Sequence, residues 1–349
     1  MNTFTKLNIK MLALAMLVSF AAVAQDEEEE VQSFSISGSV DTYFRTNFNT
    51  SDDPDEFMMD ADGNEIGNTL APATSFANQP GFSLGMANII ASYEGDKVGF
   101  TADLVFGPRG AEAVFGSEAP LNIVNQLYAY WNVSDNVTLT FGNFNTFLGY
   151  EVISPTGNFN YSTSYMFSYG PFSHSGLKAD FTFGDFTMML GVFNPTDATD
   201  FNPTGEYVGG AQLGYGGTYL NFLFDNDFFQ VDLTGGWDLS DAFYLGVNAT
   251  SASDSFYGGA FYLQNSFSDD FALGVRGEFW QDEGVGVLST GESVIDLTLS
   301  ANYTVGNLTF IPELRLDSFS EDDVVITNAR TGETANSLSS FLLAAVYSF

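Results

Sequence analysis

Charged residues stand at every second position in several apolar segments of this chain. Between residues 313 and 317, for example, Glu313, Arg315 and Asp317 alternate with Leu314 and Leu316. Successive side chains of a β-strand point to opposite faces, so such a segment would separate its charges from its aliphatic side chains. A face that carries both carboxylates and guanidinium groups can attract ions across water. The chemistry that such a face can perform is the attraction of ions, not covalent catalysis.

The same alternation between the two faces of each strand predicts twelve charged side chains on the inner face of a wide barrel. They are Asp41, Arg45, Asp103, Lys178, Asp180, Asp232, Arg276, Glu278, Asp296, Glu313, Arg315 and Asp317. Charges inside a membrane barrel require a water-filled lumen. Eight acidic residues against four basic ones would favour cations modestly. For any single charge, the alternative is an ion pair that only braces the wall.

Catalytic candidates are few, because the chain contains one histidine and no cysteine. His174 is followed by Ser175, which on a strand would point to the opposite face. The sequence has no H-E-x-x-H motif, so an outer-membrane hydrolase is the less favoured interpretation. We expect no enzyme activity and no cofactor, and a transition-metal site is disfavoured.

A calcium site in the first long loop is a weaker candidate. Asp60, Asp62 and Asn64 are spaced as at the start of an EF-hand loop. Glu65, however, stands where that loop needs its sharply turning glycine, and the distant glutamate is missing. We interpret this segment as a solvated acidic loop, as charge runs usually are.

The strands these residues require recur along the whole chain. Seven very short connections rich in Gly, Asp and Asn alternate with eight connections of uneven length. The long ones are expected near 49–83, 107–121, 143–173, 195–206, 282–292 and 318–336. Fifteen connections predict an all-β, transmembrane, antiparallel up-and-down barrel of about 16 strands. Because glycines blur the phase between 207 and 225, 14 or 18 strands remain alternatives.

Composition supports this fold class. The chain carries 36 Phe, 16 Tyr and 35 Gly, but only 15% charged residues. Outer-membrane barrels need aromatic girdles at both interfaces and small residues inside. With 44 acidic against 9 basic residues, the formal net charge is -35, which excludes nucleic acid as a partner.

The N-terminal region predicts export. Residues 1–24 combine Lys6 and Lys10, an apolar core and the Ala22-Val23-Ala24 cleavage pattern, so we expect a signal peptide. Residues 25–33 form an acidic periplasmic tail, and 34–349 form the barrel. That tail is too short for an N-terminal plug, which argues against an energy-coupled transporter.

The C-terminus predicts how the barrel is inserted. The last segment alternates apolar and aromatic residues and ends on Phe349. Final strands of this kind are read by the outer-membrane barrel assembly machinery, so Phe349 is expected to be part of an assembly signal. The expected location is the outer membrane of a double-membraned bacterium, with membrane lipid around the barrel.

The connection 143–173 is unusually aromatic. Tyr150, Glu151, Tyr161 and Tyr165 are its expected functional residues. Such a loop would be poorly solvated outside the cell, so we expect it to fold inward and constrict the lumen. Alternatives are a cap over the mouth and a longer strand end in the outer girdle. If the loop seals the lumen, the protein would be a structural or adhesive barrel rather than a channel for small solutes or ions.

Several motifs carry a family resemblance. Gly149-Tyr150-Glu151, Tyr161-Ser162-x-Ser164-Tyr165 and Pro171-Phe172-x-His174-x-Gly176 resemble the OmpL-like β-barrel porins, as do Gly38–Phe44 and the ending on Phe349. The resemblance implies a passive outer-membrane channel for small solutes, without a cofactor. Short outer connections near 226 and 254 suggest a low wall, where porin subunits commonly pack, so a homotrimer is a further expectation.

Overall fold

The computed structural model describes residues 33–50, 57–59, 65–68, 73–320, 326–327 and 334–349. The predicted signal peptide (1–24), nearly all of the acidic tail (25–33) and the calcium candidates Asp60, Asp62 and Asn64 lie outside the described residues. Those predictions therefore stay predictions.

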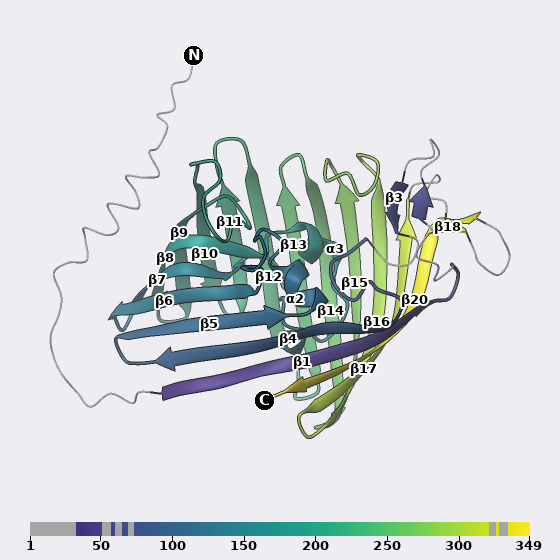
Figure 1. Cartoon of the computed structure of the whole chain (residues 1–349), viewed down its shortest axis with the longest axis horizontal. Helices are drawn as coiled ribbons and strands as arrows, with labels where there is room; N and C mark the ends of the chain where they lie inside the picture. Colours follow the sequence, from purple (N-terminus) through teal and green to yellow (C-terminus); the bar gives the residue numbers. More distant parts are fainter. Residues whose placement is uncertain (1–32, 51–56, 60–64, 69–72, 321–325, 328–333) are drawn as a thin grey trace, which may run out of the picture.

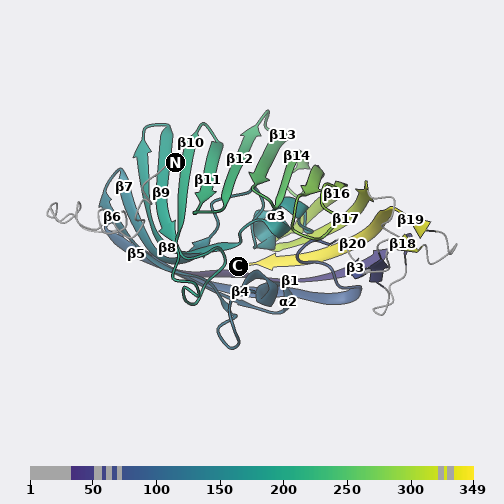
Figure 2. The ribbon, with the colours of Figure 1, turned by 90° about the horizontal axis from the view of Figure 1, so that it is seen from above.

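Sixteen antiparallel strands form one closed barrel, which confirms the predicted fold class and strand number (Figures 1 and 2). In order, the strands are β1 (Ser33–Asn47), β4 (Gly81–Glu94), β5 (Val98–Phe106), β6 (Val124–Ser134), β7 (Val137–Asn145), β8 (Ser173–Phe183), β9 (Phe186–Phe193), β10 (Val208–Tyr215), β11 (Thr218–Phe224), β12 (Phe229–Asp238), β13 (Phe243–Ala252), β14 (Phe256–Ser268), β15 (Phe271–Asp282), β16 (Ser293–Val305), β17 (Leu308–Phe319) and β20 (Ser337–Ser348).

The first and last strands close the barrel. β1 pairs with β4 on one side and with β20 on the other. Beyond β20, the main-chain N–H of Phe349 donates to Gly38 O at 3.0 Å, and Gly38 N–H donates to Phe349 O at 3.1 Å. The last residue of the chain therefore extends the closing ladder, and the barrel has no unpaired edge at this point.

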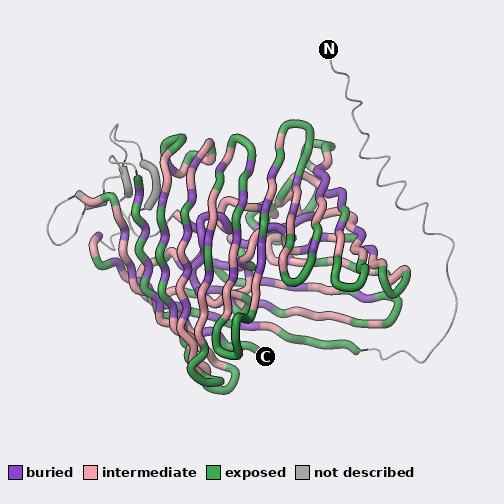
Figure 3. The backbone as a smooth tube through the Cα atoms, turned by 180° about the vertical axis from the view of Figure 1, so that it is seen from behind, coloured by how far each residue is buried: buried purple, intermediate pink, exposed green. Residues whose placement is uncertain are grey.

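The two faces of the wall differ as the alternation predicts. On β16, Leu297 and Leu299 are 49% and 44% exposed, whereas Asp296, Thr298 and Ser300 between and beside them are buried. The same alternation of buried and exposed residues runs along the neighbouring strands (Figure 3). An apolar outer band with a polar interior is the arrangement that a lipid environment requires.

The glycine-rich region that left the strand number open forms an ordinary hairpin. β10 and β11 pair from Gly209–Phe224 to Tyr215–Thr218, joined by Gly216 and Gly217. Both glycines have positive φ, 57° and 78°, which a two-residue hairpin turn requires and other residues rarely adopt. The turn therefore separates two strands, and 16 is the correct number.

Connections at the two ends of the barrel differ in length. The turns at one end have two to four residues, and the other end carries the long connections 48–80, 107–123, 146–172, 194–207, 283–292 and 320–336, with short ones at 225–228 and 253–255. The long connections contain α2 (Pro108–Ala113), the 3-10 turn η1 (Pro155–Gly157), α3 (Tyr165–Tyr169) and the small hairpins β2 (Phe57–Met59) with β3 (Glu65–Asn68), and β18 (Ile326–Thr327) with β19 (Thr334–Ala335). Within the described residues, no helix is long and apolar enough to cross a membrane.

The connection 146–172, called the inward loop below, lies within the ring of strands (Figure 2). Its helix α3 contacts β14 and β15. Tyr165 and Met166 of α3 belong to a buried cluster with Phe256, Tyr262 and Trp280 of the wall. The inward loop is thus packed as part of the interior, and the candidate site is formed where it meets the wall.

Candidate functional site

The inner face of β15, β16 and β17 carries three parallel rows of polar side chains. The strand register places Glu278, Asp296 and Asp317 in the first row. Arg276, Thr298 and Arg315 form the second row, and Ser300 and Glu313 lie in the third. The row with the two arginines therefore lies between two rows that contain carboxylates. Attraction between opposite charges in neighbouring rows stabilises all three rows.

The ion pairs within these rows are buried. Asp296 lies between both arginines, 2.8 Å from Arg276 Nη2 and 3.0 Å from Arg315 Nη2. Arg315 is also paired with Asp317 at 2.8 Å. The side chains of Arg276 and Asp296 are 0% exposed. Charges so far from water are stable only where several partners surround them.

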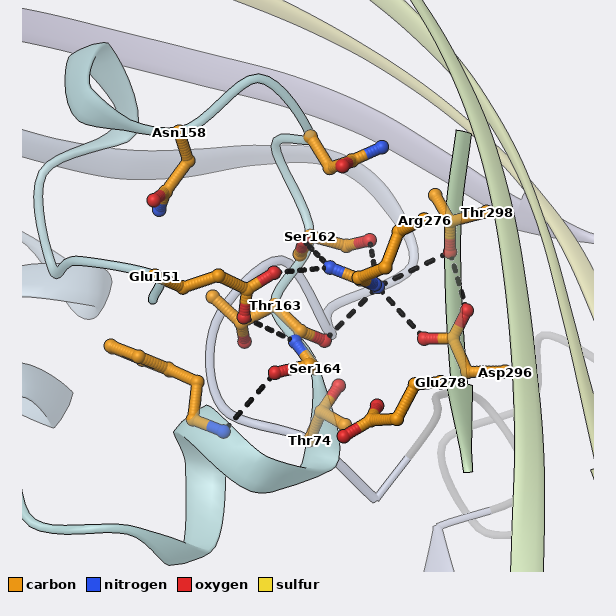
Figure 4. Close-up of polar contacts among 12 residues, drawn as sticks. Thr74, Glu151, Asn158, Ser162, Thr163, Ser164, Arg276, Glu278, Asp296 and Thr298 are labelled. Atoms are coloured by element: carbon orange, nitrogen blue, oxygen red, sulfur yellow. Dashed lines mark hydrogen bonds and ion pairs between the residues drawn. The ribbon is translucent and has the colours of Figure 1, made fainter. Parts of the chain in front are cut away.

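The inward loop supplies many of those partners (Figure 4). Arg276 Nη1 is 2.7 Å from Glu151 Oε1 of the loop and donates to Ser162 O at 2.6 Å. Arg315 Nη1 donates to Thr163 O at 2.7 Å. In the third row, Glu313 accepts from Tyr161 N at 3.0 Å and from the Ser162 hydroxyl. Main-chain and side-chain groups of the loop therefore complete the set of partners around the wall charges.

Glu278 holds the start of α3. Its two carboxylate oxygens accept the N–H groups of Tyr165 and Met166 at 2.8 and 2.7 Å. Ser164, the N-cap residue, accepts from Phe167 N at 3.1 Å. Free N–H groups at the start of a helix attract negative charge, which explains why α3 begins at this carboxylate.

Further bonds attach the inward loop to other parts of the wall. The Tyr161 hydroxyl donates to Asp41 on β1. Gly149 N–H donates to Asp232 on β12 at 2.9 Å. Asn160 donates to the Ser300 hydroxyl on β16 at 2.7 Å. The loop is thus fixed to strands on several sides of the barrel, and it crosses the lumen.

Arg109 contributes to this arrangement and is among the residues that the sequence did not single out. Arg109, on α2, donates to Ile153 O at 3.0 Å and to Tyr161 O at 3.3 Å. Its guanidinium lies 4.3 Å from the centroid of the Phe76 ring. The scarcity of cations, 9 Lys and Arg in the whole chain, is the signal that could have singled it out.

The four remaining predicted charges have other polar partners on the wall. Asp103 accepts from Asn125 at 2.7 Å and from Asn88 at 3.3 Å, while Arg45 donates to Asn47 at 2.8 Å. Lys178 and Asp180 form a partly exposed ion pair at 2.8 Å on β8. Of these four charges, Asp103 and Arg45 are buried, whereas the Lys178–Asp180 pair is partly exposed.

Space in the lumen is unevenly distributed around the inward loop. Where the loop meets the wall, two cavities measure only about 10 Å³ each, beside Asp232 and beside Arg315. A volume of this size holds about one water molecule. Toward the end with the short turns, two open cavities measure about 500 and 440 Å³. The cavities between the loop and the wall are thus far smaller than those on the short-turn side.

His174 lies in an apolar environment. Its Nε2 is 2.9 Å from the Thr146 hydroxyl, and its ring is 5.0 Å from the ring centroids of Phe147 and Phe193. Among the described residues there is also no group of three or more His, Cys, Asp or Glu side chains that could hold a metal ion. The geometry of this histidine is that of a packed core residue.

Asp197, in the connection between β9 and β10, holds the end of the inward loop. One of its carboxylate oxygens accepts the N–H groups of Phe172 and Ser173, both at 2.8 Å. Burial raises the pKa of Asp197 to about 6, although the two N–H donors act in the opposite direction. The last turn of the loop is therefore attached to a group that titrates in a mildly acidic range.

Comparisons with known proteins agree on the kind of barrel. A family model described as "Putative beta-barrel porin-2, OmpL-like" matches residues 33–349. A search of curated proteins finds no match. The fold is similar to Salmonella typhi OmpF in complex with daunomycin, with a TM-score of 0.58 at 9% identity, covering 90% of this chain and 97% of that one.

Two further solved structures are similar. An anion-selective porin from Comamonas acidovorans has a TM-score of 0.55 at 10% identity, covering 91% of this chain and all of the other. The trimer form of OmpT, an outer membrane protein of Vibrio cholerae, has a TM-score of 0.51 at 13% identity, with 91% and 99% covered. At these identities the likeness concerns the fold.

The first prediction concerns the buried ion pairs. Arg276→Met should lower the free energy of unfolding by about 3–5 kcal/mol, because it leaves Glu151 and Asp296 as buried carboxylates with one cation fewer. Chemical denaturation in detergent, followed by heat-modifiable gel mobility, measures the change. Lys178→Met is the matched control, with a loss below about 1 kcal/mol, because its ion pair is partly exposed. Equal losses in both variants would contradict the prediction.

The second prediction concerns pH. Because the pKa of Asp197 is raised in the folded state, the native protein binds more protons than the unfolded chain between about pH 4 and 6. Its contribution to stability therefore falls as pH rises through this range. Asp197→Asn keeps the accepting oxygen, so the stability of the wild type relative to this variant should decrease from pH 4 to pH 6. A pH-independent difference between the two denaturation curves would refute the assignment.

Proposed function

The chain belongs to the OmpL-like β-barrel porin-2 family, and on this premise we propose that it is a passive outer-membrane channel for small hydrophilic solutes or ions. The inward loop is the constriction that sets its conductance. The proposal makes the protein a diffusion channel and not an enzyme. Its substrate selectivity would come from the wall charges and from the width of the constriction.

The observation that carries the proposal is the multiple attachment of the inward loop. Glu278 and Glu313 accept from its main chain on one side of the barrel. Asp232 accepts from the Gly149 N–H, and Asp41 accepts from the Tyr161 hydroxyl. A loop bonded in this way has a fixed position in the lumen. A fixed obstacle narrows a water-filled barrel to a defined path, whereas a mobile one would not.

Charge at the constriction supports a preference for cations. On the predicted alternation, the inner face would carry eight acidic and four basic residues, and the loop adds Glu151 while α2 adds Arg109. Acidic groups remain in excess. Each central arginine faces at least two carboxylates, which screen its charge from a passing ion.

Location and partners follow from the outer surface. The exposed aliphatic band on strands such as β16 would face membrane lipid, and Phe349 would be read by the barrel assembly machinery. A homotrimer is the proposed assembly, with the short outer connections 225–228 and 253–255 marking the low wall. The trimer form of the Vibrio cholerae structure supports this proposal by analogy of fold.

A sealed structural or adhesive barrel is the second candidate. It is favoured by one observation: the cavities between the loop and the wall hold about one water each. In that case the buried network would serve to rigidify the barrel, and solute would not pass.

Single-channel recording in a planar bilayer tests the third prediction and separates the two candidates. We expect small, discrete steps and a cation-selective reversal potential under a salt gradient. Replacing residues 150–165 by a short Gly-Ser linker should raise conductance several-fold, because it removes the segment bonded to Glu278 and Glu313.

The matched control is the same replacement at 201–206, an outer segment composed mainly of exposed residues. It should leave conductance unchanged. Unaltered conductance after removal of 150–165 would contradict the hypothesis that the inward loop constricts the lumen. A folded wild type without current that conducts after the removal would favour the sealed barrel.

A further inference from the structure

The larger of the two open cavities has an unusual lining. It measures about 500 Å³ and lies against β10–β13 on the short-turn side of the inward loop. Its lining includes the rings of Phe147, Tyr150, Tyr219 and Tyr244, together with four glycines. The volume falls within the range of about 300–1,000 Å³ typical of small-molecule sites. Aromatic rings and glycines dominate this lining.

Tyrosine rings of this cavity lie across glycines of the inner wall. A Cβ atom at Gly214 would come within 2.8 Å of the Tyr219 ring, and one at Gly246 within 2.5 Å of the Tyr150 ring. A Cβ at Gly236 would collide with the Tyr244 hydroxyl. Any larger residue at these positions would push the rings away from the wall. The glycines thus allow each ring to rest on the backbone.

Contacts hold Tyr150 and Tyr244 in place, and Tyr219 is accessible. Tyr150 stacks on Tyr262 with centroids 4.1 Å apart and an interplanar angle of 21°, and its hydroxyl donates to that of Tyr244 at 3.0 Å. Tyr219, although it points inward, is 40% exposed. Aromatic faces fixed in this way form a preorganised platform for a ligand with a flat apolar face.

The polar groups of the cavity are neutral. Gln212 and Thr234 contribute polar groups to the lining, and Gln212 Nε2 is oriented by Asn221 Oδ1 at 2.8 Å. Of the described residues that line this cavity, none is a carboxylate, a lysine, an arginine or a histidine. In a chain of net charge -35, a wall region without ionisable charge is notable. A charged solute would find no counter-charge here to offset its lost hydration.

We propose that this cavity binds a neutral polyhydroxylated solute, that is, a carbohydrate of one or two sugar rings. The C–H faces of a sugar ring match the flat tyrosine rings, and its hydroxyl groups match the amide and hydroxyl groups beside them. The inference deepens the proposed function by naming a solute class at a site adjoining the constriction. Since Tyr150 belongs to the inward loop, the site and the constriction share a residue.

The second open cavity provides the internal comparison. It measures about 440 Å³, and Tyr130 lies across Gly99 in the same manner. Glu94 and Lys178 also line it, so its polar groups are charged. The two cavities therefore share ring geometry but differ in electrostatics, which makes Tyr130 the matched control position.

Isothermal titration calorimetry on the folded full chain, in a detergent without a sugar headgroup, tests the inference. The probes are maltose and cellobiose, with sodium gluconate as the charged comparator. At least one disaccharide should bind and gluconate should not. Tyr219→Ala should weaken disaccharide binding about tenfold, as expected for the loss of about 1.4 kcal/mol. Tyr130→Ala should leave binding unchanged.

A second variant keeps the test decisive if truncation disturbs folding. Tyr219→Leu retains bulk without a flat ring and should weaken binding to a similar extent. Absence of disaccharide binding to a barrel with wild-type gel mobility would overturn the inference, as would equal losses in the Tyr219 and Tyr130 variants, or equal binding of gluconate. Calorimetry measures binding without ion flow. The binding result therefore does not depend on whether the barrel conducts ions.

Discussion

The buried charges of the inner wall are the constraint on which the rest of the interior depends. Arg276, Asp296 and Glu278 are almost completely removed from water, and isolated charges would make such a wall unstable. Their partners come from the wall itself and from the inward loop. Carbonyl groups of Ser162 and Thr163 face the arginines, and amide groups of Tyr161, Tyr165 and Met166 face the glutamates. Wall and loop therefore stabilise each other, and neither is expected to keep this structure alone.

The same interlocking links the constriction to the wider parts of the lumen. Glu151 is paired with Arg276, and its neighbour Tyr150 lines the cavity with the tyrosine platform. Movement of Tyr150 and Glu151 would therefore alter the contact with the wall charges and the proposed solute site together. Asp197 holds the other end of the loop through Phe172 and Ser173. The loop is thus attached to the rest of the barrel near both of its ends.

Much of the fold was predictable because its signals are local. Alternation in segments such as 293–305 fixes which side chains face inward, and turn residues such as Gly306 and Asn307 mark where strands reverse. The predicted inward placement of the twelve charges depends only on that alternation. What could not be predicted depends on distant contacts. The three rows on β15–β17 arise from strand register, and the roles of Arg109 and Asp197 arise from loops that meet only in the folded chain.

Cross-linking tests most directly whether the inward loop occupies the lumen in the membrane. The chain has no cysteine, so Asn160→Cys with Ser300→Cys introduces a single pair where the two side chains touch. In native membranes, mild oxidation should join the pair, the band should shift on a non-reducing gel, and each single variant should show no shift. Two cysteines that both stay free and react fully with a water-soluble maleimide would contradict an inward loop as the central feature of this barrel.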